Sequence, residues 1–370
     1  MSAGKPERMV PMTDRKVNVL VVDDSQVARL LLVRILESDP RIRVIGAVTD
    51  GQSALDFVST AIPDVILMDI HMPGMDGFEA TRRIMETHPV PIVVCSATTS
   101  TREMTTTFRV MEAGALACVE KPVGPGHRDF EEMAETIRNT VLLMSEIKVV
   151  RRWARARLAP APPAARPVAV PRASAEVRMV GIGASTGGPQ ALQEILASLP
   201  KTFPVPILIV QHIARGFLPG LAEWLNQTTG LQVQIAALGI CPLPGHVYLA
   251  PDDFQMGISV GGRLLLTREE PENHVRPAVS YLFRSLLQAY GPAAAGVLLT
   301  GMGKDGAAEL RQMKDVGAIT IAQDFDSSVV HGMPGEAIRL GGASLVLPAG
   351  KIADGLVAAV AGRKVVEIES

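Results

Sequence analysis

The chain has 370 residues, enough for two or three domains that each bury a core. A formal net charge of −2 and only 4% aromatic residues argue against a nucleic-acid partner, and no apolar run is long enough to enter and span a membrane. The polar residues 1–16 lack the apolar stretch of a secretory signal, and three cysteines without metal-ligand spacing suit a reducing compartment, so we expect a cytoplasmic protein.

Apolar, β-rich runs alternate with helix-like runs up to residue 150. Strands are expected at 17–22, 44–48, 65–68, 92–94 and 116–119, and helices at 25–37, 52–61, 77–87, 102–113 and 130–149. Buried strands that alternate with helices predict a parallel sheet covered on both faces. We therefore expect an α/β domain over residues 17–150, behind an N-terminal extension over residues 1–16.

Polar side chains stand where the strands of this first domain end. Asp23 and Asp24 end the first strand, Asp69 ends the third, Ser96 ends the fourth, and Lys121 follows the fifth. In a doubly wound sheet these positions gather at one edge. Three carboxylates there repel one another unless a cation offsets their charge, and hard oxygen ligands suit Mg²⁺. The whole set suits phosphoryl transfer to an aspartate, whereas helix capping would explain only Asp23 and Asp24.

Three motifs of this segment resemble those of response-regulator receiver domains: VVDDS at 21–25, MDIHMPGMDG at 68–77 and EKP at 120–122. The resemblance implies a flavodoxin-like (βα)5 fold in which Asp69 accepts a phosphoryl group. It also implies Mg²⁺ ligands and phosphoryl-sensing side chains. The ligands would be Asp23, Asp24, Asp69 and the backbone carbonyl of His71, and the sensing residues Ser96 and Lys121.

Residues 151–176 hold five prolines and six arginines without apolar periodicity, which predicts a semi-rigid linker. The α/β pattern then resumes with longer connections. Strands are expected at 177–182, 205–210, 233–236, 247–250, 297–300, 319–322 and 344–347, with a hairpin over 257–267. These runs predict a second doubly wound, Rossmann-like parallel sheet with an antiparallel hairpin addition over residues 177–370.

A glycine-rich run, GIGASTGG at 181–188, lies between the first strand of this domain and a helix expected at 191–199. Such a loop can cradle a phosphate or present a serine. A dinucleotide fingerprint wants glycine where Thr186 stands, and an acid where the next strand ends in His212. The pattern therefore favours Ser185 as a nucleophile. The loop glycines would let the backbone and an ester carbonyl approach each other closely around Ser185. A nucleotide site and a simple helix N-cap at Ser185 remain open.

Candidate partners for Ser185 also follow strands. Of the seven histidines, only His212 ends a strongly apolar strand, and Asp305 follows another one in a glycine-rich run. Buried packing of the histidine and a turn or capping role for the aspartate remain open. The rivals of Asp305 are Asp315, Asp324 and Asp326.

Five motifs of this half resemble the catalytic domain of chemotaxis protein-glutamate methylesterases, the CheB family: GASTGG at 183–188, VQH at 210–212, LPGHVYLAP at 243–251, LTGMGKDGA at 299–307 and GMP at 332–334. The resemblance implies Ser185 as nucleophile, His212 as general base and acid, and Asp305 as the carboxylate that orients it. Met302 would supply an oxyanion-hole amide. Two residues depart from the family: Lys304 stands where it often has asparagine, and Ser280 where it often has aspartate.

The two resemblances together imply a phosphorylation-activated hydrolase. It would release methanol from glutamate methyl esters of methyl-accepting chemoreceptors and deamidate receptor glutamines. A CheA-type histidine kinase would donate the phosphoryl group, and the esterase reaction would need no cofactor. The unphosphorylated receiver would cover the catalytic edge. An idle adaptor and a dinucleotide-binding protein remain open, and a DNA-binding output is disfavoured because no basic recognition helix is evident.

Overall fold

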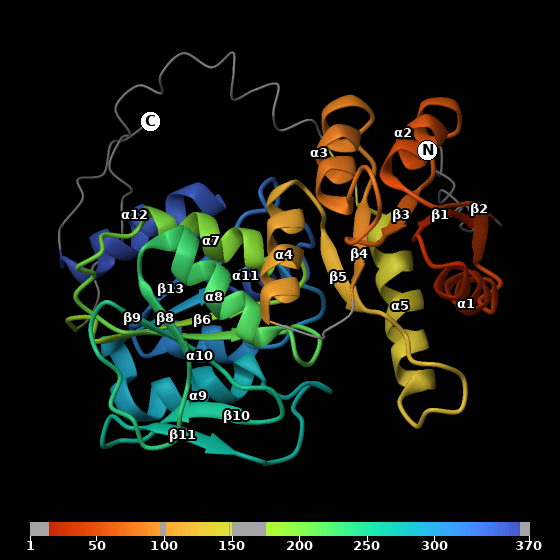
Figure 1. Ribbon diagram of the computed structural model, residues 1–370. Helices are drawn as coiled ribbons and strands as arrows, with labels where there is room; N and C mark the ends of the chain where they lie inside the picture. The colour runs from red at the N-terminus through yellow and green to blue at the C-terminus, as the bar shows by residue number, and fades with distance from the viewer. Residues whose placement is uncertain (1–14, 97–100, 148, 150–174, 363–370) are drawn as a thin grey trace, which may run out of the picture.

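The computed structural model describes residues 15–96, 101–147, 149 and 175–362, with the side chains of 101–106 left aside. The expected linker over 151–176 falls outside the described residues except for its last two, and residues 1–14 of the expected N-terminal extension also fall outside. Two parallel sheets, each with helices around it, account for most of the described chain (Figure 1). No described helix has the length and apolar character needed to cross a membrane.

The first sheet has the strand order β2-β1-β3-β4-β5, with every neighbouring pair parallel. Capping serines and aspartates fix where its helices begin: the Ser25 side chain accepts from the Ala28 amide, and the Asp50 and Asp76 side chains accept from the Ser53 and Glu79 amides. The elements are β1 (Val17–Val22), α1 (Gln26–Glu37), β2 (Ile42–Val48), α2 (Gly51–Thr60), β3 (Val65–Met68), α3 (Gly77–Thr87), β4 (Ile92–Ser96), α4 (Thr101–Glu112), β5 (Ala117–Glu120) and α5 (Phe130–Ser145).

The second sheet has the order β14-β13-β12-β6-β7-β9-β8, again with parallel neighbours, and β10 and β11 form a separate antiparallel hairpin. The elements are β6 (Met179–Ala184), α7 (Gly188–Ser198), β7 (Ile207–Gln211), α8 (Leu218–Thr229), β8 (Gln232–Ile235), β9 (His246–Leu249), β10 (Gln255–Ile258), β11 (Leu264–Thr267), α9 (Val279–Tyr290), the 3-10 turn η1 (Gly291–Ala293), β12 (Ala294–Leu298), α10 (Ala307–Asp315), β13 (Ile319–Gln323), α11 (Met333–Arg339), β14 (Leu345–Leu347) and α12 (Ala349–Val360).

The second sheet is covered on both faces. Helices α7, α8 and α12 pack over one face, and α9 and α10, with the β10–β11 hairpin beneath them, pack over the other (Figure 1). The expected fold class, two doubly wound α/β domains with a hairpin addition, is confirmed. The topology also fixes the site: the chain leaves β6 on one side toward β7 and reaches its other neighbour, β12, only later. Such a switch point opens a crevice at the carboxyl ends of the strands.

The first domain contacts the second through α4 and α8. Phe108 of α4 stacks on Trp224 of α8 with ring centroids 5.5 Å apart, and both side chains are buried. The Gln190 side chain of α7 donates to the carbonyl of Ala115 at 2.6 Å. Of these residues, Gln190 lies near the end of β6, because α7 starts four residues after that strand.

Candidate functional site

Ser185 lies at the switch-point crevice, directly after β6. Its amide donates to the Thr300 carbonyl beyond β12 at 3.0 Å, and its own carbonyl accepts from the Gln211 side chain at 2.8 Å. A Cβ atom on Gly301 would lie 2.6 Å from the Cβ of Ser185, so only glycine lets the loop after β12 come this close. Gln211, which sequence reasoning missed, thus holds the backbone of the candidate nucleophile.

Two glycines of the glycine-rich run lie within β6 and have a packing role. A Cβ on Gly181 would lie 2.3 Å from the Leu286 side chain, and one on Gly183 would lie 2.4 Å from Val279. These glycines let α9 pack tightly against β6. The Gly188 amide, at the start of α7, already donates to the Ser185 carbonyl at 2.8 Å, which also disfavours a phosphate cradle there.

His212 and Asp305 come together as predicted from their places after β7 and β12. His212 Nε2 lies 3.0 Å from Asp305 Oδ2, and the His212 amide donates to the carbonyl of Ala184, the residue before Ser185. With a proton on Nε2 shared with the carboxylate, Nδ1 is the nitrogen left to accept a proton. Within the described residues, no hydrogen bond joins the side chains of Ser185 and His212.

Asp305 also caps a helix. Its carboxylate accepts from the Val279 amide at 2.6 Å and the Ser280 amide at 3.1 Å, the first donors of α9, and from the Asn273 side chain at 2.9 Å. Burial, which leaves the residue 3% exposed, raises the pKa of Asp305. The hydrogen bond and charge of His212 and the two helix amides outweigh that burial and hold the pKa below its ordinary value. The carboxylate is therefore kept ionised to face the imidazole.

A cleft of about 790 Å³ opens beside this pair and is lined by residues that include His212, His274, Met302, Lys304, His331 and Arg339. Met302 is 61% exposed, and among the described residues its amide donates to no acceptor. Lys304 is exposed at the cleft, and its ammonium makes no ion pair with Asp305.

Two of the three rival aspartates have other partners. Asp315 pairs with Arg311 at 2.7 Å on the exposed side of α10, and Asp324 accepts from the Ser327 amide and hydroxyl. Neither contacts His212. Ser280, the second departure, is buried and donates its hydroxyl to Glu309 at 2.7 Å. A carboxylate therefore lies near position 280, but a different residue provides it.

A second polar cluster occupies the carboxyl edge of the first sheet. Carboxylate oxygens of Asp23, Asp24 and Asp69 all lie within 4.8 Å of one another, and Lys121 Nζ is 2.8 Å from both Asp23 and Asp69. Burial, followed by the charge of Asp23, raises the pKa of Asp69, although Lys121 opposes the shift. Hard oxygen donors gathered this closely fit a divalent cation such as Mg²⁺.

The remaining predicted residues of this edge lie around that cluster. Ser96 is buried at the end of β4, and its carbonyl accepts from the Lys121 amide at 2.9 Å. His71 is exposed in the loop after Asp69, so its side chain is not needed for the backbone-carbonyl role expected of it.

Both halves of the chain are similar to known proteins. A model of the CheB methylesterase family matches residues 180–356, and a model of the response regulator receiver domain matches residues 19–131. A protein-glutamate methylesterase/protein-glutamine glutaminase of Nitrosospira multiformis is 55% identical over 349 residues, which cover 94% of this chain and 98% of the relative. A relative of the same name, numbered 1, from Syntrophus aciditrophicus is 52% identical, with 92% and 97% covered. The crystal structure of the Thermotoga maritima CheB methylesterase catalytic domain is 41% identical over 50% of this chain and 98% of that chain, with a TM-score of 0.48.

Proposed function

Because the chain belongs to the CheB family of protein-glutamate methylesterases and protein-glutamine glutaminases, with a receiver domain in front, we propose that Ser185, His212 and Asp305 carry out its ester and amide hydrolysis. The observation that carries this assignment is the 3.0 Å contact between His212 and Asp305 at the crevice where Ser185 also lies. All three residues follow strands of one parallel sheet, and the carboxyl ends of those strands share one edge.

The reaction follows from the orientation of the histidine. Ser185 Oγ attacks the side-chain carbonyl carbon of a glutamate methyl ester while Nδ1 of His212 takes the hydroxyl proton. The ionised Asp305 stabilises the imidazolium through Nε2, and the Met302 amide donates to the oxyanion. His212 then returns the proton to the leaving methoxide, and methanol departs. Water hydrolyses the acyl-enzyme by the same steps, and a glutamine substrate releases ammonia in place of methanol.

The first domain provides the regulation. Asp69 accepts a phosphoryl group from a CheA-type histidine kinase, and Lys121 and Ser96 sense it. Magnesium, when bound by Asp23, Asp24, Asp69 and the His71 carbonyl, would offset the charge of that group. The substrates are methyl-accepting chemoreceptors, whose modified residues the enzyme meets in the cytoplasm.

We further propose that the receiver restrains the catalytic site until it is phosphorylated. Val329 packs against a hydrophobic cluster of the receiver and also lies over Gly187, where a Cβ would be 2.6 Å from it. The α4–α8 contact and the Gln190 hydrogen bonds hold the receiver beside the helix that follows Ser185. The proposed boundaries are 17–150 for the receiver, 151–176 for the linker and 177–370 for the catalytic domain.

One assay tests the catalytic assignment. The full-length protein and its Ser185→Ala variant are incubated with receptor methylated on glutamate, and released methanol is measured. We expect release from the parent protein and none from the variant. Equal release from both would refute the serine assignment, and no release from the phosphorylated parent protein would favour the idle adaptor.

A further inference from the structure

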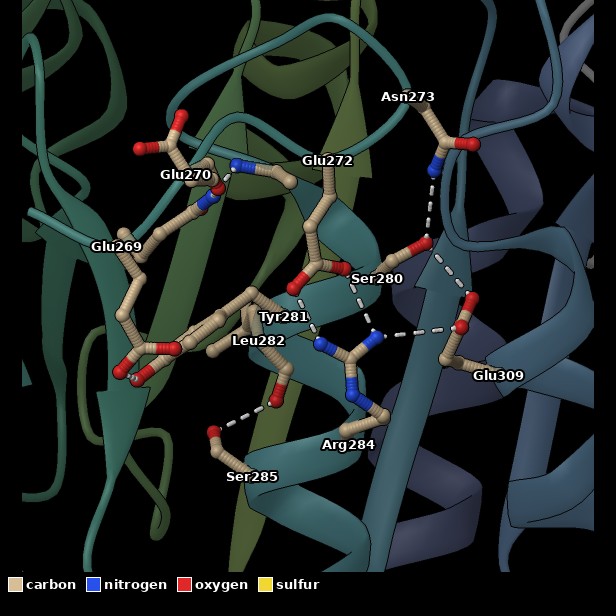
Figure 2. Close-up of polar contacts among 12 residues, drawn as sticks. Glu269, Glu270, Glu272, Asn273, Ser280, Tyr281, Leu282, Arg284, Ser285 and Glu309 are labelled. Atoms are coloured by element: carbon tan, nitrogen blue, oxygen red, sulfur yellow. Dashed lines mark hydrogen bonds and ion pairs between the residues drawn. The ribbon is translucent and has the colours of Figure 1, made fainter.

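A cluster of polar side chains lies behind the His212–Asp305 pair. Figure 2 shows a chain of hydrogen bonds and ion pairs that runs from Asn273 to Ser280, Glu309, Arg284 and Glu272 in that order. These five residues are called the Arg284 cluster below. Three of them come from outside α9, which carries Ser280 and Arg284. The cluster therefore ties a turn and a helix to the segment around Asp305.

Asn273 is the member of the cluster whose side chain touches the catalytic carboxylate. Its side-chain nitrogen donates to Asp305 Oδ1 at 2.9 Å and to the Ser280 hydroxyl oxygen at 3.2 Å. Both neighbours of that nitrogen accept hydrogen bonds, so the amide group has one orientation that satisfies them. Asn273 and Asp305 both line the cleft beside His212.

Asn273 sits in a tight turn with left-handed backbone. Its φ is 51° and that of His274 is 67°, while Glu272 and Val275 exchange two backbone hydrogen bonds across the turn. Left-handed residues other than glycine cost roughly 1–2 kcal/mol each, and least for asparagine. Such a turn needs outside contacts to hold it in one place.

Arg284 supplies those contacts. Its guanidinium binds both carboxylate oxygens of Glu272, the residue that opens the turn, and reaches Glu309 at 3.4 Å. The Ser280 hydroxyl in turn donates its hydrogen bond to Glu309, so its oxygen accepts from Asn273 and from the Gly306 amide. Each hydrogen-bonding group of the Ser280 hydroxyl is therefore used, and the turn is anchored at two points.

From this arrangement we infer that Asn273 is a positioning residue: held by the rest of the Arg284 cluster, it fixes Asp305 Oδ1 so that Oδ2 faces His212. The inference rests on the proposed function of the Ser185–His212–Asp305 set. Without the Asn273 donor, Oδ1 keeps one donor among the described residues, the Ser280 amide, and Asp305 lines the cleft. The carboxylate can then turn toward water, which weakens its bond to His212 and the stabilisation of the imidazolium.

Three substitutions of Asn273 in the full-length protein separate a donor role from a turn role. Glycine and aspartate both tolerate left-handed backbone, and neither offers the donor; alanine loses both features. A donor role predicts that N273G and N273A lower kcat by about tenfold to hundredfold with KM within about twofold, and that N273D is worse, because its carboxylate faces Asp305. A turn role alone predicts that N273G keeps the parent kcat, whereas N273A, which disfavours the left-handed turn, lowers it.

A spectroscopic readout complements the kinetics. The proton shared by His212 Nε2 and Asp305 gives a downfield proton resonance, which we expect to move upfield or broaden beyond detection in N273G. Arg284→Gln should lower kcat less than N273A and add nothing in the N273A background, because both act on one carboxylate. Arg41→Gln, which removes a similar bidentate pair with Asp39 in the receiver, is the matched control and should change neither readout.

The outcomes distinguish this inference from the proposed function. If the parent protein releases methanol and S185A does not, but N273G keeps the parent kcat and the resonance, the positioning role is wrong while the nucleophile stands. If S185A is as active as the parent protein, the proposed function itself fails. Thermal unfolding of each variant shows that the compared proteins are folded.

Discussion

Replacing Asp305 with asparagine tests the catalytic and the helix-capping role of one side chain together. Each carboxylate oxygen accepts two hydrogen bonds within the described residues, one of them from an α9 amide: Val279 on Oδ2 and Ser280 on Oδ1. Asparagine has one oxygen, so its amino group must face one of these pairs. In either orientation a buried helix amide loses its acceptor, which costs about 1–3 kcal/mol.

The same substitution disables the histidine. With the amino group toward His212, Nε2 must become an acceptor, and the ring proton moves to Nδ1, the nitrogen that should take the Ser185 proton. With the amino group toward Asn273, the imidazolium faces a neutral oxygen and loses its counter-charge. We expect kcat for methanol release to fall by about 10³–10⁴-fold. Thermal unfolding of the catalytic domain should move down by about 2–4 °C per kcal/mol lost.

The pH dependence of this stability loss has a definite sign. Because the folded-state pKa of Asp305 lies below its ordinary value, the ionised side chain stabilises the fold above the unfolded pKa, and that stabilisation disappears as the pH falls through the folded pKa. The difference in unfolding free energy between the parent protein and D305N should therefore be constant at neutral pH and shrink in acid.

An exposed aspartate provides the matched control for D305N. Asp315→Asn removes only the exposed pair with Arg311, so its unfolding free energy should change by less than about 1 kcal/mol and its kcat should not change. A D305N variant as stable and as active as the parent protein would refute the reasoning. So would a stability difference that stays constant into acid, since it would show that ionised Asp305 contributes nothing.

Three further predictions follow from contacts described above. Gly301→Ala should abolish methanol release because its Cβ would overlap Ser185, whereas Gly124→Ala, with open space around that Cβ position, should not; an active G301A would show that the loop can retreat. Phe108→Ala, which breaks the stack on α8, should raise basal methanol release severalfold without phosphorylation, and unchanged basal release from a folded variant would argue against restraint by the receiver. Asp69→Asn should raise the thermal unfolding midpoint of the receiver at pH 7, and by a smaller amount in acid. The raised pKa of Asp69 means that its ionised side chain destabilises the fold at pH values above the ordinary pKa. A lower midpoint for the variant at pH 7 would contradict this.

The fold was predictable from the sequence because both sheets are parallel and buried on two faces. Such strands are continuous apolar runs, and β1 and β3 have the bounds that those runs predict. Where the observed bounds of a strand differ from the predicted ones, pairing with the neighbouring strand decides them rather than the hydrophobicity of the residues. The strand expected at 297–300 begins at Ala294, because the small Ala294 and Ala295 pair with Met179 and Val180 of β6 and bury little apolar surface of their own.

The catalytic candidates were predictable for a related reason: each follows a strand, and the carboxyl ends of parallel strands share one edge. Asn273 was not, because a turn carries it and a contact between Glu272 and Arg284, which are twelve residues apart, sets the place of that turn. The role of Gln211 was not predictable either, because a polar residue at the end of β7 was already expected in His212. Side chains that orient a site through tertiary contacts leave no periodic pattern in the sequence.

Asp305 shows why two interpretations that compete in the sequence can both hold in the structure. A turn or capping aspartate and an orienting carboxylate were alternatives, yet Asp305 caps α9 from 26 residues away and contacts His212 with the same oxygen. One sequence signal points to this arrangement. Ala278, at the N-cap of α9, has no side-chain oxygen, so the first amides of a buried helix need an acceptor from elsewhere. The helix amides that stabilise α9 through this bond are the ones that keep the carboxylate ionised, so stability and catalysis depend on the same hydrogen bonds.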